Sequence, residues 1–247
     1  SPGAPFFLNF MTIAASVHLH WGTAARTLLA SCDFTPIKDC LLADYSDTFE
    51  DALAAREAAK LPVPDEVQEA VKTLLRWSGE DPEREGLLDT PKRVARAWKE
   101  YCEGYQENPA IHLARTFEEV GGYDELVLLK NIPFHSHCEH HMAPIIGKAS
   151  IAYMPTDRVV GISKLARVLH GFARRLQVQE RLTAEVAECI WENLKPQGVA
   201  VVVEASHSCM TARGVRTPGV GMTTSRLLGC FLDDSRSRKE VLSLMGY

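Results

Sequence analysis

Cys138-Glu139-His140-His141 is the stretch that decides how this chain folds and what it can bind. Strand-like runs flank it, residues 126–129 before and residues 145–153 after, so the four residues form the turn between two predicted strands. Two residues separate Cys138 from His141. One tight turn can therefore direct a thiolate and an imidazole at the same ion.

A second group of metal-binding residue types, His207-Ser208-Cys209, follows a predicted buried strand far downstream. Cys209 supplies a third soft ligand and completes a Cys₂His set. Three protein ligands leave the fourth tetrahedral position of Zn²⁺ open to water, which is typical of catalytic zinc. His140 and His207 are then spare and can handle protons. The pattern predicts a hydrolytic zinc enzyme.

A closed structural zinc site is the alternative interpretation of the same residues. Such a site needs a fourth protein ligand, which His135 or His137 would supply. The two spare histidines favour the open, catalytic site.

Length and composition limit the classes of protein that fit. The chain has 247 residues, 46% of them hydrophobic and 24% charged, and a formal net charge of −5. The acidic balance argues against broad affinity for nucleic acid. No apolar run reaches the roughly 18 residues that a membrane helix needs. Seven cysteines without a staple-like spacing favour a reducing compartment, and we expect a cytoplasmic protein.

The chain divides into three predicted regions. Residues 1–45 form a poorly defined extension, for which a signal or transit peptide is the less favoured interpretation. Residues 46–120 are helical, with helices at 47–60, at 65–77 and from Thr90 onward. Asp47 and Thr90 are the predicted caps of the first and third helices, and Pro91 stands at the first helical position.

The sequence pattern of residues 121–247 predicts an α+β domain. After the two strands around the Cys-Glu-His-His turn, Ser163 caps an amphipathic helix, and a second helix carries Leu182 and Val186 on one face. Strands follow at 198–204 and 225–232. The order strand, strand, helix, helix, strand, strand favours an antiparallel sheet with packed helices.

Basic residues gather near the predicted metal site. Lys164 begins a helix, Arg167 lies one turn on, and Arg213 follows Cys209 by four residues. A helix start attracts phosphate, so a nucleotide triphosphate suits this cluster. A solvated basic face is the alternative.

Gln179 and Glu180 stand at the start of the second helix. They are either capping residues or readers of a guanine edge, whose N1–H and 2-amino donors match a carboxylate. Their spacing alone leaves both interpretations open.

With these residues in place, the chain closely resembles the zinc-dependent GTP cyclohydrolase I family from about residue 47 to the C-terminus. Six ordered blocks carry the resemblance: residues 86–94, 133–136, 138–141, 161–167, 174–183 and 207–215. The resemblance implies a tunnelling fold preceded by a helical region. It also implies a decamer of two pentamers, with active sites at subunit interfaces.

The resemblance assigns roles to the candidate site residues. Cys138, His141 and Cys209 match the zinc ligands, and His140, His207 and Ser163 match catalytic positions. The substrate-binding positions are Glu180 and Gln179 for guanine, and Lys164, Arg167, Arg213 and Arg93 for the triphosphate, with Ser163 beside them. The implied reaction opens the GTP imidazole ring at C8, releases formate and yields 7,8-dihydroneopterin triphosphate, the entry to folate or pterin synthesis. Neither nucleic acid nor a membrane is an expected partner.

The chain also departs from the family pattern. Ser150 stands where many relatives carry His, and Ser206, Ser208 and Ala212 replace larger or charged residues near the third ligand. None removes a ligand. Two other functions compete: a catalytically silent nucleotide-binding paralogue with structural zinc, and a related tunnelling-fold enzyme acting on another purine or pterin.

Overall fold

The computed structural model describes residues 62–117 and 125–247. The helix expected at 47–60 lies outside the described residues. Within them, no helix is both long enough and apolar enough to cross a membrane.

The N-terminal described region is helical, as predicted. Helix α4 spans Asp65–Trp77, matching the predicted bounds. Asp65 and Glu66 in its first turn and Arg76 in its last turn suit the helix dipole. Helix α5 spans Thr90–Tyr101 and packs against α4. Three short 3₁₀ helices complete the region: η1 (Glu85–Leu87), η2 (Glu103–Tyr105) and η3 (Pro109–Leu113).

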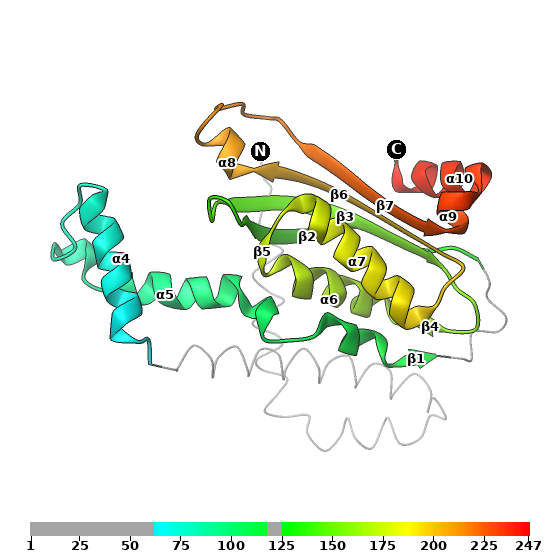
Figure 1. Ribbon diagram of the computed structural model, residues 1–247, viewed down its shortest axis with the longest axis horizontal. Helices are drawn as coiled ribbons and strands as arrows, with labels where there is room; N and C mark the ends of the chain where they lie inside the picture. The colour runs from blue at the N-terminus through cyan, green and yellow to red at the C-terminus, as the bar shows by residue number, and fades with distance from the viewer. Residues whose placement is uncertain (1–61, 118–124) are drawn as a thin grey trace, which may run out of the picture. The chain divides into compact units, whose positions relative to one another are not determined.

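A five-stranded sheet forms the rest of the domain, in the order β5-β2-β3-β6-β7 (Figure 1). Every neighbouring pair is antiparallel except β5 and β2, which run parallel. The strands are β2 (Val127–Cys138), β3 (Pro144–Met154), β5 (Leu176–Gln177), β6 (Gly198–His207) and β7 (Met222–Gly229). A separate two-stranded sheet pairs β1 (Thr116–Phe117) with β4 (Val159–Val160).

Helices cover both faces of the sheet. Helices α6 (Ile162–Ala173) and α7 (Gln179–Leu194) pack on one face and enclose the main core (Figure 1). On β6, Val199, Val201 and Val203 point into that core, whereas Ala200 and Val202 point into a smaller one beneath the C-terminal helices. The alternation follows from the two-residue period of a strand. The predicted α+β class, with an antiparallel sheet and packed helices, is confirmed.

Two predicted caps are wrong by one or two residues. Asp89 is the N-cap residue of α5, so Thr90 is the first helical residue. Gly161 is the N-cap residue of α6, because the Lys164 N–H donates to the Gly161 carbonyl at 2.9 Å and closes the first turn there. Ser163 therefore lies inside the first turn of α6.

The last predicted strand ends early. Gly229 has φ +56°, and a side chain there would meet the Gln197 carbonyl oxygen at 2.3 Å. This left-handed glycine turns the chain out of the sheet. Residues 230–232, expected in the strand, instead belong to helix α9 (Cys230–Asp233), and helix α10 (Ser235–Met245) follows without having been predicted.

Strand pairing gathers the site residues at one end of the sheet. His137 pairs with Pro144 across the β2–β3 turn, and Ile145 pairs with His207 at the end of β6. Cys138 stands opposite Gln177, just before α7 begins. The end of β2, the start of α7 and the end of β6 are far apart in the sequence but lie beside one another in the structure. Helix α8 (Ser208–Thr211) continues directly from β6.

Candidate metal centre

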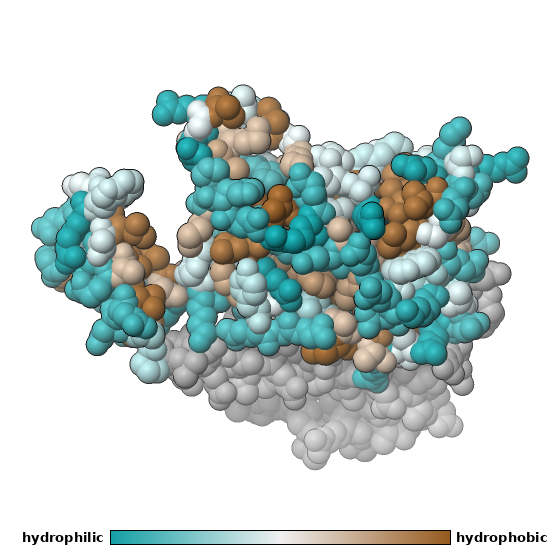
Figure 2. All heavy atoms as spheres, in the orientation of Figure 1, coloured by the Kyte–Doolittle hydropathy of each residue, from teal (hydrophilic) through white to brown (hydrophobic). Residues whose placement is uncertain are grey.

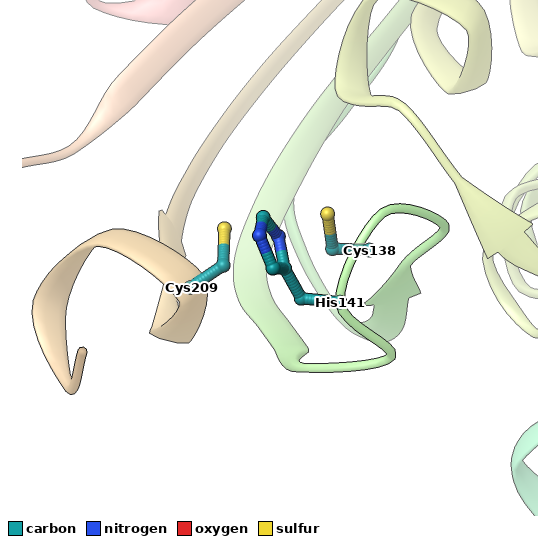
Figure 3. A group of neighbouring side chains, drawn as sticks. All are labelled: Cys138, His141 and Cys209. Carbon is teal, nitrogen blue, oxygen red and sulfur yellow. The ribbon is translucent and has the colours of Figure 1, made fainter. Parts of the chain in front are cut away.

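Cys138, His141 and Cys209 form one cluster. Their ligand atoms all lie within 4.8 Å of one another, and Figure 3 shows the three side chains directed into a common space. Cys138 is the last residue of β2, His141 lies in the turn between β2 and β3, and Cys209 comes from α8. The structure thus brings together the two stretches that the sequence pattern singled out.

The turn that carries two of these donors is tightly closed by its own backbone. The Met142 N–H donates to the Cys138 carbonyl at 2.7 Å, and the Cys138 N–H donates to the Ala143 carbonyl at 2.8 Å. Met142 adopts the left-handed region, with φ +53°. The turn needs this conformation to reverse the chain within four residues. As a result, Cys138 and His141 are held on the same side.

The chemistry of the donors fits zinc. Two thiols and one imidazole are ligands that zinc prefers, and three of them leave a position for a substrate or water. Burial raises the pKa of the Cys209 thiol and the neighbouring Cys138 adds to this effect, while Arg213 opposes it. A cation bound between the sulfur atoms would displace the thiol protons.

His137 does not face this cluster. Its ring packs against both Trp98 and Tyr101 of α5, with centroid distances of 5.1 and 4.7 Å. Burial lowers the pKa of His137, and its neighbour His135 lowers it further. Among the described residues, the group that could hold an ion consists of the three donors alone. The geometry therefore favours the open site over the closed one.

The two spare histidines flank the cluster. Nδ1 of His140 lies 3.8 Å from the Cys138 sulfur, and the ring is exposed to solvent. His207 lies at the end of β6, where Nε2 is 2.7 Å from Oε1 of Gln179. Burial lowers the pKa of His207, and the charge of Glu180 partly offsets this. Glu180 is thus close enough to act on the same ring.

Gln179 and Glu180 occupy different environments despite being adjacent. Gln179 is fully buried at the start of α7, whereas Glu180 is exposed. The amide of Gln179 contacts protein groups throughout, including His207. A contact of Gln179 with a substrate base stays a prediction.

An ion pair that the sequence did not reveal holds the metal-binding turn. The Arg181 guanidinium donates to the Glu139 carboxylate at 2.5 Å. Arg181 also donates to the Gln177 side chain at 3.1 Å and to the Leu176 carbonyl at 3.0 Å. The Glu139 N–H in turn donates to the Gln177 carbonyl. Arg181 lies 42 residues from Glu139 in the chain, so only the three-dimensional structure could reveal the pair.

The predicted phosphate-binding residues do not all lie together. Ser163 and Lys164 are in the first turn of α6, Arg167 is one turn on, and all three are half-buried. Arg213 lies near enough to Cys209 to affect its pKa. Arg93 is in α5, where its guanidinium pairs with Asp89 at 3.1 Å. Within the described part of one chain, no contact joins Arg93 to the three donors.

Ser150 fits its place in the sheet. It is buried on β3, and its hydroxyl accepts a hydrogen bond from the Asn131 N–H at 3.4 Å. Asn131 has φ +56° and lies where the pairing of β2 and β3 shifts register. The small hydroxyl therefore satisfies a backbone donor that an irregularity of the sheet leaves exposed.

A Cys₂His cluster at the end of an antiparallel sheet, with two histidines beside it, defines a zinc-dependent hydrolase. The chain belongs to the GTP cyclohydrolase I family, whose model matches residues 67–246. Family membership and the donor cluster confirm the predicted enzyme class and its zinc cofactor.

Similar proteins from three bacteria, each described as GTP cyclohydrolase 1, match most of the chain. The Hyphomonas neptunium protein is 53% identical over 77% of this chain and 92% of its own. The Brucella anthropi protein is 58% identical over 68% of this chain and 79% of its own. The Brucella suis protein is 50% identical over 83% of this chain and 97% of its own.

Two solved structures resemble parts of the chain. An archaeosine synthase QueF-Like structure in the apo form has a TM-score of 0.36 and 21% identity, covering 42% of this chain and 93% of its own. Escherichia coli dihydroneopterin aldolase in complex with neopterin has a TM-score of 0.31 and 13% identity. The match covers 41% of this chain and 98% of the aldolase chain.

Proposed function

We propose that this chain converts GTP and water to formate and 7,8-dihydroneopterin triphosphate, the first step of tetrahydrofolate or pterin synthesis. The observation that supports this most directly is the cluster of Cys138, His141 and Cys209. His140 lies against the Cys138 sulfur, and His207 precedes Cys209 by two residues. Family membership supplies the substrate.

Cys138, His141 and Cys209 would hold the zinc ion. When bound, zinc supplies Lewis-acid chemistry: it lowers the pKa of water so that a nucleophile forms near neutral pH. Burial of Cys138 keeps bulk water from one side of the cluster, while the exposed His141 leaves the other side accessible.

The two spare histidines would move protons. We assign to His207 the proton delivered to N7 as the imidazole ring of GTP opens at C8, since its ring is half-buried beside the cluster. His140 is exposed and would serve the second hydrolysis, which releases formate, and the rearrangement of the ribose. Ser163 would act on the ribose side in that step.

The remaining predicted residues would hold the substrate. The exposed Glu180 carboxylate, close to His207, would accept from the N1–H and 2-amino donors of guanine. Lys164, Arg167 and Arg213 would bind the triphosphate, which fixes C8 in place through a remote anchor. Arg93 would join them from a neighbouring subunit, since within the described part of one chain its guanidinium pairs with Asp89 on the surface of α5 and has no contact with the three donors.

A site completed by a neighbouring subunit agrees with the decamer of two pentamers that we propose. Apolar side chains lie at the surface of the α4–α5 pair (Figure 2), including Leu74 at 62% exposure and Trp77 at 86%. Large exposed apolar side chains in a group are typical of protein interfaces. We therefore place a subunit contact here.

We further propose three regions: an extension at 1–45, a helical region at 46–120 and the catalytic domain at 121–247. A cytoplasmic location also belongs to the proposal. It is supported by the five cysteines of the described residues, all of which are free thiols.

Formate release from GTP, measured with and without a chelator, tests the proposed function. We expect the zinc-loaded protein to release formate and form an absorbing pterin, and the chelator to stop both. His207→Ala should abolish formate release while the zinc content stays unchanged, because His207 is not a donor of the cluster. Undiminished turnover of this variant would refute the role of His207.

A silent nucleotide-binding paralogue is the competing function. It predicts GTP binding without formate, and a fourth protein ligand in the absorption spectrum of the cobalt-substituted protein. The packing of His137 against Trp98 and Tyr101 argues against that ligand.

A further inference from the structure

We propose that Gln179 is a positioning residue that fixes the orientation and the tautomer of His207, rather than a residue that reads the substrate base. The inference rests on the proposed function, because it assigns which nitrogen of His207 exchanges the proton. It is carried by the hydrogen bonds around one fully buried amide.

The first step concerns the two ends of the Gln179 amide. Nε2 lies 3.0 Å from the Val203 carbonyl, 3.0 Å from the Met222 carbonyl and 3.2 Å from the Thr224 hydroxyl. A carbonyl oxygen only accepts, so the group facing Val203 and Met222 must be the NH₂ donor. Reversing the amide would place its oxygen against two carbonyl oxygens in a buried site, which is strongly unfavourable. The amide orientation is therefore determined.

The second step concerns two threonine hydroxyls, of Thr183 and Thr224, which form hydrogen bonds with each other and with Gln179. Thr183 Oγ1 donates to the Gln179 backbone carbonyl at 2.7 Å, and Thr224 Oγ1 lies 2.6 Å from Thr183 Oγ1. Because Thr183 uses its one proton on the carbonyl, Thr224 must donate to Thr183. The two hydrogens of the Gln179 amide face the Val203 and Met222 carbonyls, so the Thr224 oxygen, at 3.2 Å, shares one of them. The ring of hydrogen bonds has one consistent direction. It ties α7 to β7 and immobilises the amide.

The third step transfers this orientation to His207. With its nitrogen committed to β6 and β7, Gln179 presents Oε1 to Nε2 of His207 at 2.7 Å. An oxygen acceptor at this distance requires a proton on Nε2. Nδ1 is then the ring nitrogen that accepts or delivers a proton during the reaction. A ring held in this way need not reorient when it changes partner.

The burial of Gln179 favours the positioning of His207 over the recognition of a substrate base. Its side chain has no exposed surface, whereas the adjacent Glu180 is open to solvent. Every polar atom of the Gln179 side chain already has a protein partner. A base would have to break these bonds to reach the amide, whereas Glu180 can bind a base without such a loss.

The decisive variant is Gln179→Met, which keeps the length of the side chain and removes both hydrogen-bonding ends. We expect kcat to fall by about 10- to 100-fold, within the range that a general acid–base group contributes. GTP affinity, measured on zinc-free protein that does not turn over, should change by less than about threefold, as should the zinc content. Gln197→Met is the matched control, because the Gln197 amide donates to the Pro155 carbonyl outside the site; it should leave both quantities unchanged.

Opposite results overturn the proposal. If Gln179→Met weakens GTP binding while kcat at saturation is retained, Gln179 reads the base. An unchanged kcat also refutes it. A neutron structure of the wild-type enzyme covers the case in which the variant does not fold: a deuteron on Nε2 of His207, facing the oxygen of Gln179, supports the inference, and its absence refutes it. Failure of the proposed function is distinct, since wild-type protein would then release no formate.

Discussion

At the scale of single residues, the Arg181–Glu139 pair makes the most direct prediction. Glu139 stands between the donor Cys138 and His140, and Arg181 holds its carboxylate from α7. Arg181→Met should loosen the turn that carries two of the three donors. We expect zinc affinity to fall by about 10- to 100-fold, the usual cost of losing a residue that orients a metal ligand. Competition with a chromogenic chelator measures it.

Arg226→Met is the control for this change. Arg226 pairs with Glu188 at 3.1 Å, with exposure close to that of Arg181, but on the α7–β7 surface. An exposed pair of this kind contributes little to stability. Zinc affinity should therefore stay at the wild-type value. Equal affinities in both variants would show that Arg181 does not hold the metal-binding turn.

The sequence was sufficient to find the three donors but not the residues that orient them. Cys138 and His141 are close in the chain, and Cys209 follows a recognisable His-x-Cys pattern, so a local signal existed for each. The contacts of Arg181 and Gln179 join residues 42 and 28 positions apart. Such contacts depend on how α7 packs on the sheet. In the sequence, Gln179 was indistinguishable from a capping residue or a base reader.

At the scale of secondary-structure elements, the capping of α10 gives a prediction with a defined pH dependence. The Asp234 carboxylate accepts from the N–H groups of Arg236 and Ser237 and from the Ser237 hydroxyl. These bonds hold the pKa of Asp234 below its ordinary value, and those from Ser237 have the largest effect. Asp234→Ala should lower the Tm of the protein, whereas the adjacent Asp233→Ala should not.

The sign of the pH effect follows from the direction of this pKa shift. A carboxylate with a lowered folded-state pKa stabilises the fold fully above its unfolded pKa, and the stabilisation is lost as pH falls through the folded value. The Tm difference between wild type and Asp234→Ala should thus be constant from neutral pH down to about pH 5. It should narrow as pH falls below about 5, where the carboxyl of the unfolded chain begins to bind protons, and vanish below the lowered folded-state pKa. A difference that already narrows near neutral pH would contradict the capping role.

The contact between η2 and α6 depends on a glycine. A side chain on Gly104 would meet the Gly171 carbonyl oxygen at 2.2 Å and the Arg174 carbonyl oxygen at 2.8 Å. Arg175 donates to the Gly104 carbonyl at 2.8 Å across the same contact. Gly104→Ala should force the segments apart and cost about 1–3 kcal/mol of unfolding free energy. Denaturant titration measures the loss.

Gly221→Ala is the matched control for Gly104→Ala. Its added carbon would lie 3.9 Å from the nearest atom, the Ala205 carbonyl oxygen. The free energy of unfolding should be nearly unchanged. A Gly104→Ala variant as stable as this control would mean that the two segments can separate without cost.

Elements with strong local signals were predicted better than those defined by tertiary contacts. The bounds of α4 followed from Pro64 before it and from the charges at its two ends. Helix α10 has few apolar residues and buries only Val241 and Met245, so its pattern was weak. The end of β7 depends on the positive φ of Gly229, which lies against Gln197 and Trp191. The sequence alone does not reveal that Gln197 and Trp191 lie against this glycine.

At the scale of the whole molecule, the apolar surface of α4 and α5 predicts how subunits assemble. Leu74 and Trp77 are largely exposed in the single chain. Replacing both with Ser should leave each subunit folded but shift the particle mass, measured by analytical ultracentrifugation, from that of the proposed decamer toward smaller species. Ile111→Ser, at a site of 59% exposure in η3, is the control and should keep the wild-type mass. An unchanged mass in the double variant would place the contact elsewhere.

Loss of assembly should also reduce catalysis if Arg93 acts from a neighbouring subunit. Arg93 is in α5 and pairs with Asp89 within its own chain. Smaller species of the double variant should then show a raised KM for GTP, while each subunit keeps its zinc. Steady-state kinetics on the separated species measure this. A wild-type KM in the smallest species would show that Arg93 does not bind the triphosphate in trans.

The joining of β3 to β6 in the sheet has a consequence for biosynthesis. During translation, a growing chain presents the Cys138–His141 turn well before the ribosome has added Cys209, and β6 must align on β3 before the last sulfur reaches the first two donors. A two-donor site holds zinc weakly, so firm metal capture would mark the completion of this late, long-range pairing. Zinc retention would thus report that a newly made subunit has matured.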